Sequence, residues 1–310
     1  MKDRGTAAYV GLYRQGKLSQ RVQQAREILR SCQVCPHGCQ GNRLDGELGK
    51  CRTGAQAMVS SYGPHFGEES PLVGQGGSGT IFFTNCNLKC VFCQNYSISQ
   101  MGEGREVTAE ELAAMMLFLQ KRGCHNINLV SPTHVVPQIL EALELAVAEG
   151  LSVPLVYNSG GYDSVETLKL LEGIVDIYMP DIKYSHDETA RQYSGIDNYP
   201  AVNRAAVKEM HRQVGDLEVD ERGIAIKGLL VRHLVLPHGL AGTEETTRFL
   251  AKEISLNTYL NVMAQYHPCH QAFRFPLLSR ATTREEFAEA VDLARRQELK
   301  RLDRLYAFLE

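Results

Sequence analysis

Short apolar segments alternate with amphipathic segments along most of the chain, from Gly79 onward. Six of the apolar segments are rich in β-branched or aromatic residues and are apolar at nearly every position. This pattern is typical of parallel strands that are covered on both faces. We therefore expect six strands, at Thr80–Thr84, Asn126–Val130, Pro154–Asn158, Val175–Pro180, Leu229–Leu236 and Leu260–Gln265.

Helix-start signals stand between these strands. Capping boxes, in which a Ser or Thr and a Glu three residues later bond each other's backbone, occur at Thr108–Glu111, Ser185–Glu188 and Thr283–Glu286. Asp163–Glu166 is the aspartate analogue. The first box predicts a helix that ends near Gly123, and another helix runs from about Val136 to Gly150, because glycine is favoured just after a helix.

The order of the elements predicts an α/β fold. Strands with helices between them imply right-handed βαβ units and a parallel sheet. The alternation fits either a doubly wound sheet or a partial (β/α) barrel, and periodicity alone does not separate the two. A small hairpin around Glu221–Gly223 interrupts it before the fifth strand.

The first 75 residues do not follow this alternation. They are rich in glycine, charged residues and cysteine, with one expected helix near Leu18–Leu29. We expect a cysteine-rich metal-binding region over residues 1–75, the α/β unit over 76–280, and a C-terminal helical segment over 281–310.

Composition and charge exclude several classes of protein. The formal net charge of the 310 residues is -3 and no basic cluster stands out, which argues against nucleic-acid binding. No stretch approaches the roughly 18 apolar residues of a membrane span, and the N-terminus lacks the apolar segment of a signal peptide. We therefore expect a cytoplasmic protein with no membrane partner. Nine cysteines in that reducing compartment indicate metal or redox chemistry.

Three of the cysteines lie directly after the first expected strand. In GSGTIFFTNCNLKCVFCQNYSIS their spacing is Cys86-x3-Cys90-x2-Cys93. Loops at the carboxyl ends of strands carry the chemistry in α/β and barrel folds. Iron–sulfur clusters normally take four thiolates, so three leave one iron open for catalysis. The alternatives are a zinc site that recruits a histidine as fourth ligand, or three cysteines without a metal.

This motif resembles the signature of the radical S-adenosylmethionine (SAM) superfamily, Cys-x3-Cys-x-aromatic-Cys, with Phe92 as the aromatic residue. The resemblance implies that Cys86, Cys90 and Cys93 hold a 4Fe-4S cluster whose open iron binds SAM. An electron from the cluster then splits SAM into methionine and a 5′-deoxyadenosyl radical. The implied fold is a partial (β/α)6, TIM-like barrel, which decides between the two sheet arrangements.

Later segments resemble one branch of that superfamily, the activating enzymes of glycyl-radical enzymes, which include pyruvate formate-lyase activating enzyme. The segment Met179-Pro-Asp181-Ile-Lys183 is similar to their Asp-Leu-Lys element, and VRHLVLP is similar to their Val-Arg-x-x-Val-x-Pro. By position, the resemblance places SAM and a monovalent cation beside residues at the strand ends, namely Asn158, Ser159, Met179, Asp181, Lys183, Arg232 and His267.

One segment departs from the superfamily. Many members carry Gly-Gly-Glu-Pro after the second strand, where it meets the amino group of SAM, but this chain has Val130-Ser-Pro-Thr-His134. Ser131, Thr133 or backbone carbonyls would accept that amine instead. Relatives of the activating enzymes carry a similar Pro-Thr-His, so we interpret the change as a mark of a subfamily.

A second group of cysteines precedes the barrel. It is a complete four-ligand set with the spacing Cys32-x2-Cys35-Pro-x2-Cys39 and, after an eleven-residue gap, Cys51. Such a set suits a structural zinc or a second iron–sulfur cluster equally well. The arrangement, followed by HFGEES-PL, resembles a subfamily of activase homologues that carry this element at the N-terminus. The role of Cys269, in HPCH after the sixth strand, stays open between a hydrogen-atom donor, a ligand and an inert thiol.

The main functional hypothesis is an enzyme whose adenosyl radical abstracts hydrogen from a glycine of a protein partner, as the resemblance to activating enzymes implies. It also implies a reductant such as flavodoxin or ferredoxin. Three alternatives remain: a radical SAM enzyme acting on a small molecule or another peptide, a non-catalytic iron–sulfur electron carrier, and a zinc-stabilised binding module.

Overall fold

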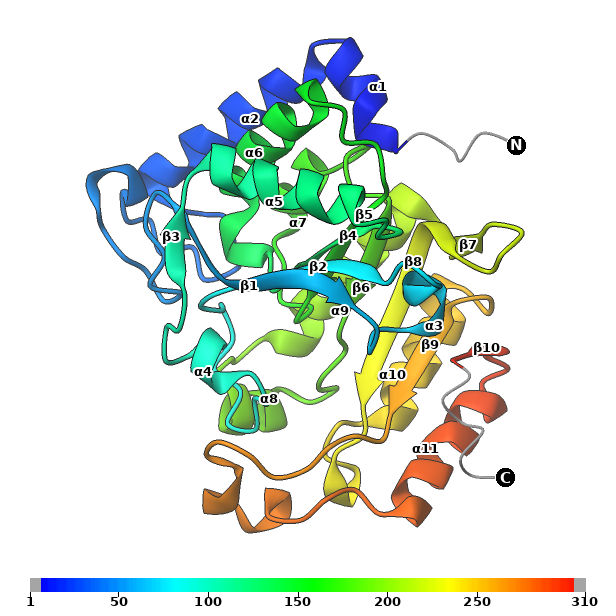
Figure 1. The fold of residues 1–310 in the computed structure, drawn as a ribbon. Coiled ribbons are helices and arrows are strands. Elements are labelled where there is room, and N and C mark those ends of the chain that lie inside the picture. The colour runs from blue at the N-terminus through cyan, green and yellow to red at the C-terminus, as the bar shows by residue number, and fades with distance from the viewer. Residues whose placement is uncertain (1–6, 304–310) are drawn as a thin grey trace.

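A computed structural model describes residues 7–303 of the chain (Figure 1). Its framework is one sheet with the strand order β10-β9-β8-β6-β5-β4-β2-β1-β3, and β7 pairs with β8. The strands are β1 (Ala57–His65), β2 (Ser78–Phe83), β3 (Arg105–Val107), β4 (Ile127–Val130), β5 (Leu155–Ser159), β6 (Ile177–Pro180), β7 (Glu218–Val219), β8 (Ala225–Leu234), β9 (Tyr259–Met263) and β10 (Arg301–Leu302).

The six expected parallel strands are confirmed. They are β2, β4, β5, β6, β8 and β9, and each pairs in parallel with the next one in chain order. A doubly wound sheet would reverse its strand order at a switch point, and these strands show no reversal. The arrangement is therefore the partial barrel, and the expected hairpin is confirmed as β7 paired antiparallel with β8.

Helices cover the outer face of these strands (Figure 1). None of the helices within residues 7–303 is long and apolar enough to cross a membrane. The helices are α1 (Ala8–Arg14), α2 (Lys17–Ile28), α3 (Ser70–Val73), α4 (Tyr96–Ser99), α5 (Ala109–Lys121), α6 (Val136–Ala148), α7 (Val165–Leu170), α8 (Asp187–Ser194), α9 (Tyr199–Val214), α10 (Thr243–Phe249) and α11 (Arg284–Arg296).

Two of the four expected capping boxes are confirmed, and the other two do not form although a helix begins within two residues of each. Thr108 and Thr283 cap α5 and α11, each with its reciprocal glutamate. Ser185 does not cap α8, because its hydroxyl donates to the Gly242 carbonyl at 2.8 Å. Asp163 does not cap α7, whose N-cap is Ser164, because its carboxylate accepts hydrogen bonds from neighbouring strand ends. In both cases a tertiary partner competes for the local capping group.

The first 75 residues contain more regular structure than the sequence predicts. The expected helix is confirmed as α2, but β1 was not expected. It pairs antiparallel with β2, and its last residue, His65, lies opposite Ser78 at the start of β2. The sequence does not predict this strand, because it contains serines together with Gly63 and Pro64, which are disfavoured in strands.

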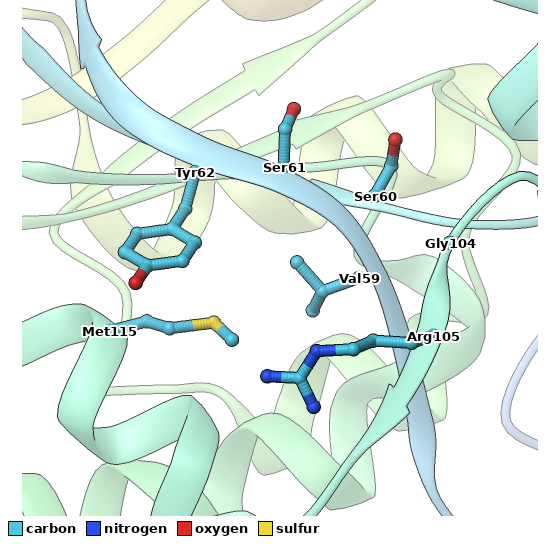
Figure 2. Close-up of a pocket in the computed structure, with 7 residues that line it drawn as sticks. All are labelled: Val59, Ser60, Ser61, Tyr62, Gly104, Arg105 and Met115. Atoms are coloured by element: carbon cyan, nitrogen blue, oxygen red, sulfur yellow. The ribbon is translucent and has the colours of Figure 1, made fainter.

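A groove of about 470 Å³ lies beside the edge of β1 (Figure 2). It exists because β3 pairs only with the first part of β1, from Ala57 to Val59. The groove contains none of the expected site residues, and it is lined by Val59, Ser60, Ser61, Tyr62, Gly104, Arg105 and Met115.

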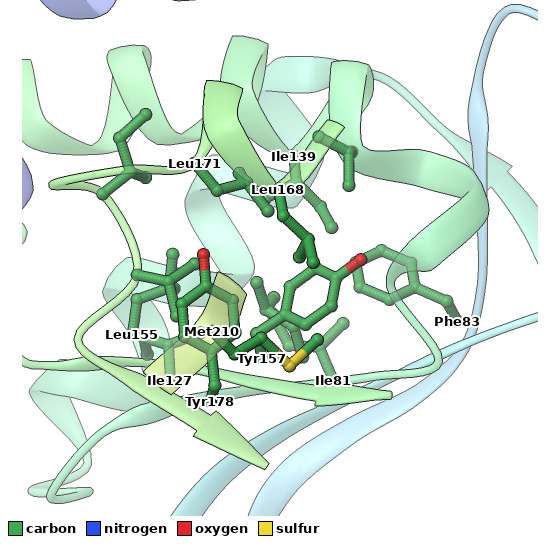
Figure 3. Close-up of a cluster of buried hydrophobic side chains, with 14 of the residues drawn as sticks. Ile81, Phe83, Ile127, Ile139, Leu155, Tyr157, Leu168, Leu171, Tyr178 and Met210 are labelled. Carbon is green, nitrogen blue, oxygen red and sulfur yellow. The ribbon is translucent and has the colours of Figure 1, made fainter. Parts of the chain in front are cut away.

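The main apolar core fills the space between the parallel strands and the helices (Figure 3). Each side chain is almost fully removed from water, which stabilises the fold by roughly 25 cal/mol per Å² of buried apolar surface. Members from the strands and the helical layer include Ile81, Ile127, Leu155, Tyr157, Tyr178, Ile139, Leu168, Leu171 and Met210.

The segment between β1 and β2, residues 66–77, contacts strands on both sides of the barrel, and we call it the arm. On one side the Leu72 carbonyl accepts a hydrogen bond from Asn126 Nδ2 at 2.9 Å, next to β4. On the other side Glu69 Oε1 accepts one from Asn261 Nδ2 of β9 at 3.0 Å. The Leu72 side chain packs in a buried cluster with inward-facing strand residues that include Val156, Ile177, Met179 and Leu230. The arm therefore plugs the N-terminal end of the barrel.

The buried His233 predicts a loss of stability in mild acid. Its Nδ1 lies 2.8 Å from the Ile182 carbonyl and its Nε2 lies 2.9 Å from Thr243 Oγ1. Burial lowers its pKa to about 4, against about 6.5 in the unfolded chain. Between pH 6.5 and pH 4 this imidazole is therefore protonated in the unfolded chain and neutral in the folded chain. The free energy of unfolding consequently falls as the pH drops toward 4.

At pH 5 this single histidine should lower the free energy of unfolding by about 2 kcal/mol. Urea unfolding at pH 7.5 and pH 5 should show a smaller acid loss for His233→Gln than for the wild type. Replacing the exposed His186 by Gln should leave the acid loss unchanged. Equal losses in wild type and His233→Gln would contradict the prediction.

Candidate functional site

The three clustered cysteines lie in the loop that leaves β2, at the carboxyl end of the parallel strands. Their thiols are close enough to influence one another electrostatically, and Cys86 and Cys90 also sense the ammonium of Lys183. Each sulfur has a close polar neighbour: Leu88 N lies 3.4 Å from Cys86, Ser194 Oγ 3.0 Å from Cys90 and Ser99 Oγ 3.2 Å from Cys93.

The protonation of Cys86 and Cys90 follows from their burial. Burial raises the pKa of Cys86 to about 12, the Leu88 N–H lowers it, and the other two thiols raise it. Burial also raises the pKa of Cys90. Thiols of this kind stay protonated near neutral pH and release their protons when a metal binds, because the thiolate is the ligand.

A charged network lies at the ends of the neighbouring strands. Asp181 Oδ1 accepts from Arg232 Nε at 2.8 Å, and Asp181 Oδ2 accepts from Lys183 Nζ at 2.6 Å. Arg232 Nη2 also donates to Asn158 Oδ1 at 2.7 Å. Burial alone would raise the pKa of Asp181, but the two cations hold it below its ordinary value. The structure therefore brings four of the expected residues together as a charged group beside the cysteine loop.

Three other expected residues lie outside this charged network, and each has different neighbours. Met179 is fully buried in the apolar cluster around Leu72. The Ser159 hydroxyl donates to Asp163 Oδ2 at 2.6 Å. Ser131 has a φ of 58°, and its N–H donates to the Asn158 carbonyl at 2.9 Å. All three lie at the strand ends, where the sequence places them.

Asp163 fixes the geometry of these strand ends. It accepts hydrogen bonds from three hydroxyls, those of Thr133 at 2.6 Å, Tyr157 at 2.9 Å and Ser159 at 2.6 Å. Burial raises its pKa, and the three hydroxyls oppose that shift. Because Thr133 follows β4 and the other donors lie on β5, this carboxylate ties two neighbouring strand ends together.

The loop after β9 packs on the cysteine loop. The Cys269 thiol lies 3.1 Å from the Phe92 carbonyl, and Gln271 N donates to the Val91 carbonyl at 2.8 Å. The Phe92 ring is buried edge-on against Tyr266, with ring centroids 5.7 Å apart. His267 is exposed, and its Nδ1 lies 3.4 Å from Gln94 Nε2, just past Cys93.

The N-terminal cysteine group folds into a compact loop. Burial raises the pKa of Cys35 to about 12, and Cys51, Cys32 and Cys39 raise it further. At Gly49 a Cβ atom would lie only 2.7 Å from Cys39 Sγ, so only glycine fits. Among residues 7–303, no three His, Cys, Asp or Glu side chains are arranged to surround a single metal ion. A metal at this group is therefore a proposal that rests on the donor set.

Lys89 connects the two cysteine groups, and the sequence analysis did not single it out. Its ammonium lies within electrostatic range of Cys86 and Cys93 on one side and of Cys51 on the other. Its Nζ is buried and makes no hydrogen bond to any described residue. Burial lowers its pKa. Its position between Cys86 and Cys90 is the sequence feature that could have identified it, because a cation there offsets the negative charge of thiolates.

Glu68 and Glu69 were also missed as site residues. Both reach Arg232, with nearest N–O distances of 3.9 Å, and their side chains are 9% and 4% exposed. The signal was the HFGEES-PL segment, which carries two adjacent acids before an apolar turn. Nothing in that local pattern shows that the arm turns into the barrel.

Residues 80–231 match the Radical SAM superfamily. The chain belongs to the radical SAM superfamily. The segment that matches this family begins in β2 and contains the cysteine loop, Asp181 and Lys183. Members of the radical SAM superfamily use a 4Fe-4S cluster and SAM, which makes this chain a radical SAM enzyme.

Two relatives and one solved structure are similar to the chain. The uncharacterized protein MJ0674 of Methanocaldococcus jannaschii is 34% identical over 292 residues, covering 91% of this chain and 79% of that protein. Pyruvate formate-lyase-activating enzyme of Clostridium pasteurianum is 28% identical over 152 residues, covering 46% of this chain and 63% of that enzyme. HydG, a maturase of the [FeFe]-hydrogenase, matches with a TM-score of 0.46 and 13% identity over 70% of this chain and 48% of HydG.

The residues of this radical SAM chain fit the two groups that the family implies. The donor set at the first loop is three free thiols, which is one fewer than a closed cluster requires. The polar neighbours of the sulfurs suit a cluster, since hydrogen bonds to the sulfurs tune it. The strand-end network offers both cations and acceptors, which the carboxylate and amine of SAM need.

Proposed function

We propose that Cys86, Cys90 and Cys93 hold the 4Fe-4S cluster of this radical SAM enzyme. The observation that supports this most directly is the approach of Lys183, from the end of β6, to Cys86 and Cys90 of the loop after β2. It brings the three-thiol loop and the charged strand ends into one site. When bound, the cluster supplies the electron that splits SAM into methionine and a 5′-deoxyadenosyl radical.

The residues of the chain have distinct roles in this proposal. Asn158, Ser159, Met179, Asp181 and Lys183 line the SAM and cation site together with Ser131, Arg232 and His267. Asp181 stays ionised because its pKa is lowered by Arg232 and Lys183, so it accepts hydrogen bonds from the hydroxyls or amine of SAM. The buried rings of Phe92 and Tyr266 keep water from the cysteine loop.

For the hydrogen donor, we propose a glycine in a protein partner, as in activating enzymes. The partial similarity to pyruvate formate-lyase-activating enzyme supports this. A flavodoxin or ferredoxin would then deliver the electron, and the reaction would take place in the cytoplasm. The second candidate is a small molecule or another peptide, and the buried acids Glu68 and Glu69 favour it, because they offer charge recognition inside the barrel.

Anaerobic reconstitution tests the proposal. The chain is loaded with iron and sulfide, reduced with dithionite and given SAM, and 5′-deoxyadenosine is measured by chromatography. We expect product only when both dithionite and SAM are present. A reconstituted chain that binds SAM without cleaving it would contradict the proposal, and one that binds no SAM would support the electron-carrier alternative.

For the four N-terminal cysteines we propose a bound metal, either a structural zinc or a second cluster. The two are separated by analysing a variant in which Cys86, Cys90 and Cys93 are all replaced by alanine. Iron and acid-labile sulfide that persist in this variant identify a second cluster at Cys32, Cys35, Cys39 and Cys51. One zinc per chain identifies a structural site.

A further inference from the structure

The arm places two adjacent carboxylates inside the barrel, above the plug formed by Leu72. Glu69 is held by Asn261 of β9, and both Glu68 and Glu69 approach Arg232 of β8 to 3.9 Å. Asn261 and Arg232 are direct partners in the register of these two strands. The carboxylates therefore belong to the same inward-facing layer as the charged strand-end network.

Among residues 7–303, this layer contains fewer cations than carboxylates. Lys183 is engaged by Asp181 at 2.6 Å, and the short hydrogen bonds of Arg232 go to Asp181 and Asn158. Glu68 and Glu69 interact with Arg232 only at a longer range, with nitrogen–oxygen distances of 3.9 Å each. Three carboxylates thus face two cations, and the deficit lies on the side of the arm.

An unpartnered polar atom lies at the same place. Glu69 Oε2 is buried and has no hydrogen-bond donor among the described residues. Asn128 is fully buried on β4, and a hydrogen bond from its amide lowers the pKa of Glu68. A buried polar group left unpaired costs about 1–3 kcal/mol, so Glu69 Oε2 marks a place that a ligand would complete.

The protonation of Glu68 agrees with a missing cation. Burial raises its pKa to about 7, Arg232 opposes the shift, and Glu69 adds to it. Near neutral pH a proton therefore occupies this carboxylate part of the time. A bound cation would displace that proton, because an opposite charge favours the ionised form.

The layer is not completely sealed from water. The side chains of Arg232, Asp181 and Glu68 keep 17%, 12% and 9% of their surface exposed. The opposite end of the barrel is filled by Leu72 and its apolar neighbours.

We propose that Glu68, Glu69 and Asn128 form a subsite that binds a positively charged group of the hydrogen donor, a primary amine or a guanidinium. The carbon that loses hydrogen then lies between this subsite and the cysteine loop. The inference rests on the proposed radical SAM function and adds the substrate class. The charged group can belong to a free amine or amino acid, or to a Lys or Arg side chain of a peptide.

The first test uses the reconstituted full chain and small probes that differ only in charge. Methylguanidinium is compared with N-methylurea, and n-butylammonium with n-butanol, by anaerobic calorimetry of thermal unfolding. At least one cation should raise the Tm of the wild type at a concentration where its neutral partner does not. Glu68→Gln and Glu69→Gln should reduce this shift, whereas Glu149→Gln, an exposed site, should keep it.

The second test identifies the source of the charge. Titration calorimetry compares L-arginine with L-citrulline, and a glycine-centred peptide that carries arginine with the same peptide that carries citrulline. The charged member of the productive pair should bind at least about tenfold tighter, because hydrogen bonds to charged groups are strong. If only the free amino acids show this difference in affinity, the ligand is a free molecule. If only the peptides show it, the ligand is a side chain of a peptide.

Three results would overturn the subsite: no discrimination by charge in any pair, discrimination retained in both glutamine variants, or equal stabilisation by Mg²⁺. The 5′-deoxyadenosine assay on the same preparations separates this from failure of the proposed function. A chain that cleaves SAM but ignores charge refutes only the subsite. A chain that cleaves no SAM refutes the radical SAM assignment of these residues.

Discussion

Replacing Cys86 by alanine should abolish the reductive cleavage of SAM. The loop itself contributes three thiols, and a cluster held by two of them would be lost or misplaced. Iron bound per chain and 5′-deoxyadenosine formed under dithionite measure the effect, and the product should fall to the level found without enzyme.

The matched control is Cys124→Ala. Cys124 is a single buried cysteine next to β4 and lies outside both cysteine groups. This variant should keep the wild-type iron content at the first loop and most of the cleavage. If Cys86→Ala, folded by circular dichroism, still forms 5′-deoxyadenosine at the wild-type rate, the assignment of the loop is wrong.

The second large effect is expected from Asp181→Asn, which keeps the shape of the side chain and removes its charge. Arg232 and Lys183 would lose the carboxylate that they share at 2.8 and 2.6 Å. Breaking a buried ion pair from one side leaves an uncompensated charge and lowers stability by about 3 kcal/mol or more. SAM binding should weaken at least about tenfold, because charged hydrogen bonds at the strand ends are lost.

Urea unfolding and calorimetric titration with SAM measure these two effects separately. Asp197→Asn is the matched control, since Asp197 pairs with Arg191 on the surface, where both side chains are exposed. Surface pairs contribute only about 0–1 kcal/mol, so both measurements should stay near the wild type. Unchanged SAM affinity in Asp181→Asn would exclude the strand-end network as the cofactor site, whatever happens to stability.

The parallel strands could be predicted because their sequence pattern follows from their surroundings. A strand covered on both faces must be apolar at nearly every position, and β2, β4, β5, β6, β8 and β9 obey this rule closely enough to be found. β1 is only partly buried along its length, and it contains Gly63 and Pro64. Its place is set by pairing with β2, which no local pattern reports.

The two wrong capping predictions have a common cause. Ser185 and Asp163 carry the right side chains at the right spacing, but each finds a partner distant in the sequence. A capping bond is worth about 1 kcal/mol, so a buried carboxylate with three hydroxyl donors easily outweighs it. Thr108 and Thr283 kept their predicted roles because no such competitor reaches them.

The expected site residues were found with unequal detail. The spacing of Cys86, Cys90 and Cys93 identified the loop, and the resemblance to activating enzymes placed Asp181, Lys183 and Arg232 at one strand edge. The sequence did not show that Arg232 contacts Asp181 and the arm together, or that Lys89 lies between the two cysteine groups. Those contacts join segments far apart in the chain.

By itself the sequence determined the family, the parallel strands and the three-thiol loop, because short-range spacing and periodicity are enough to specify them. Only the tertiary structure decided how the barrel interior is charged. The arm crosses the N-terminal end of the barrel because β1 runs antiparallel to β2, and this brings Glu68 and Glu69 to Arg232, more than 160 residues away in the chain. Long-range pairing of this kind leaves no local signature, since a buried and an exposed pair of glutamates read the same in sequence.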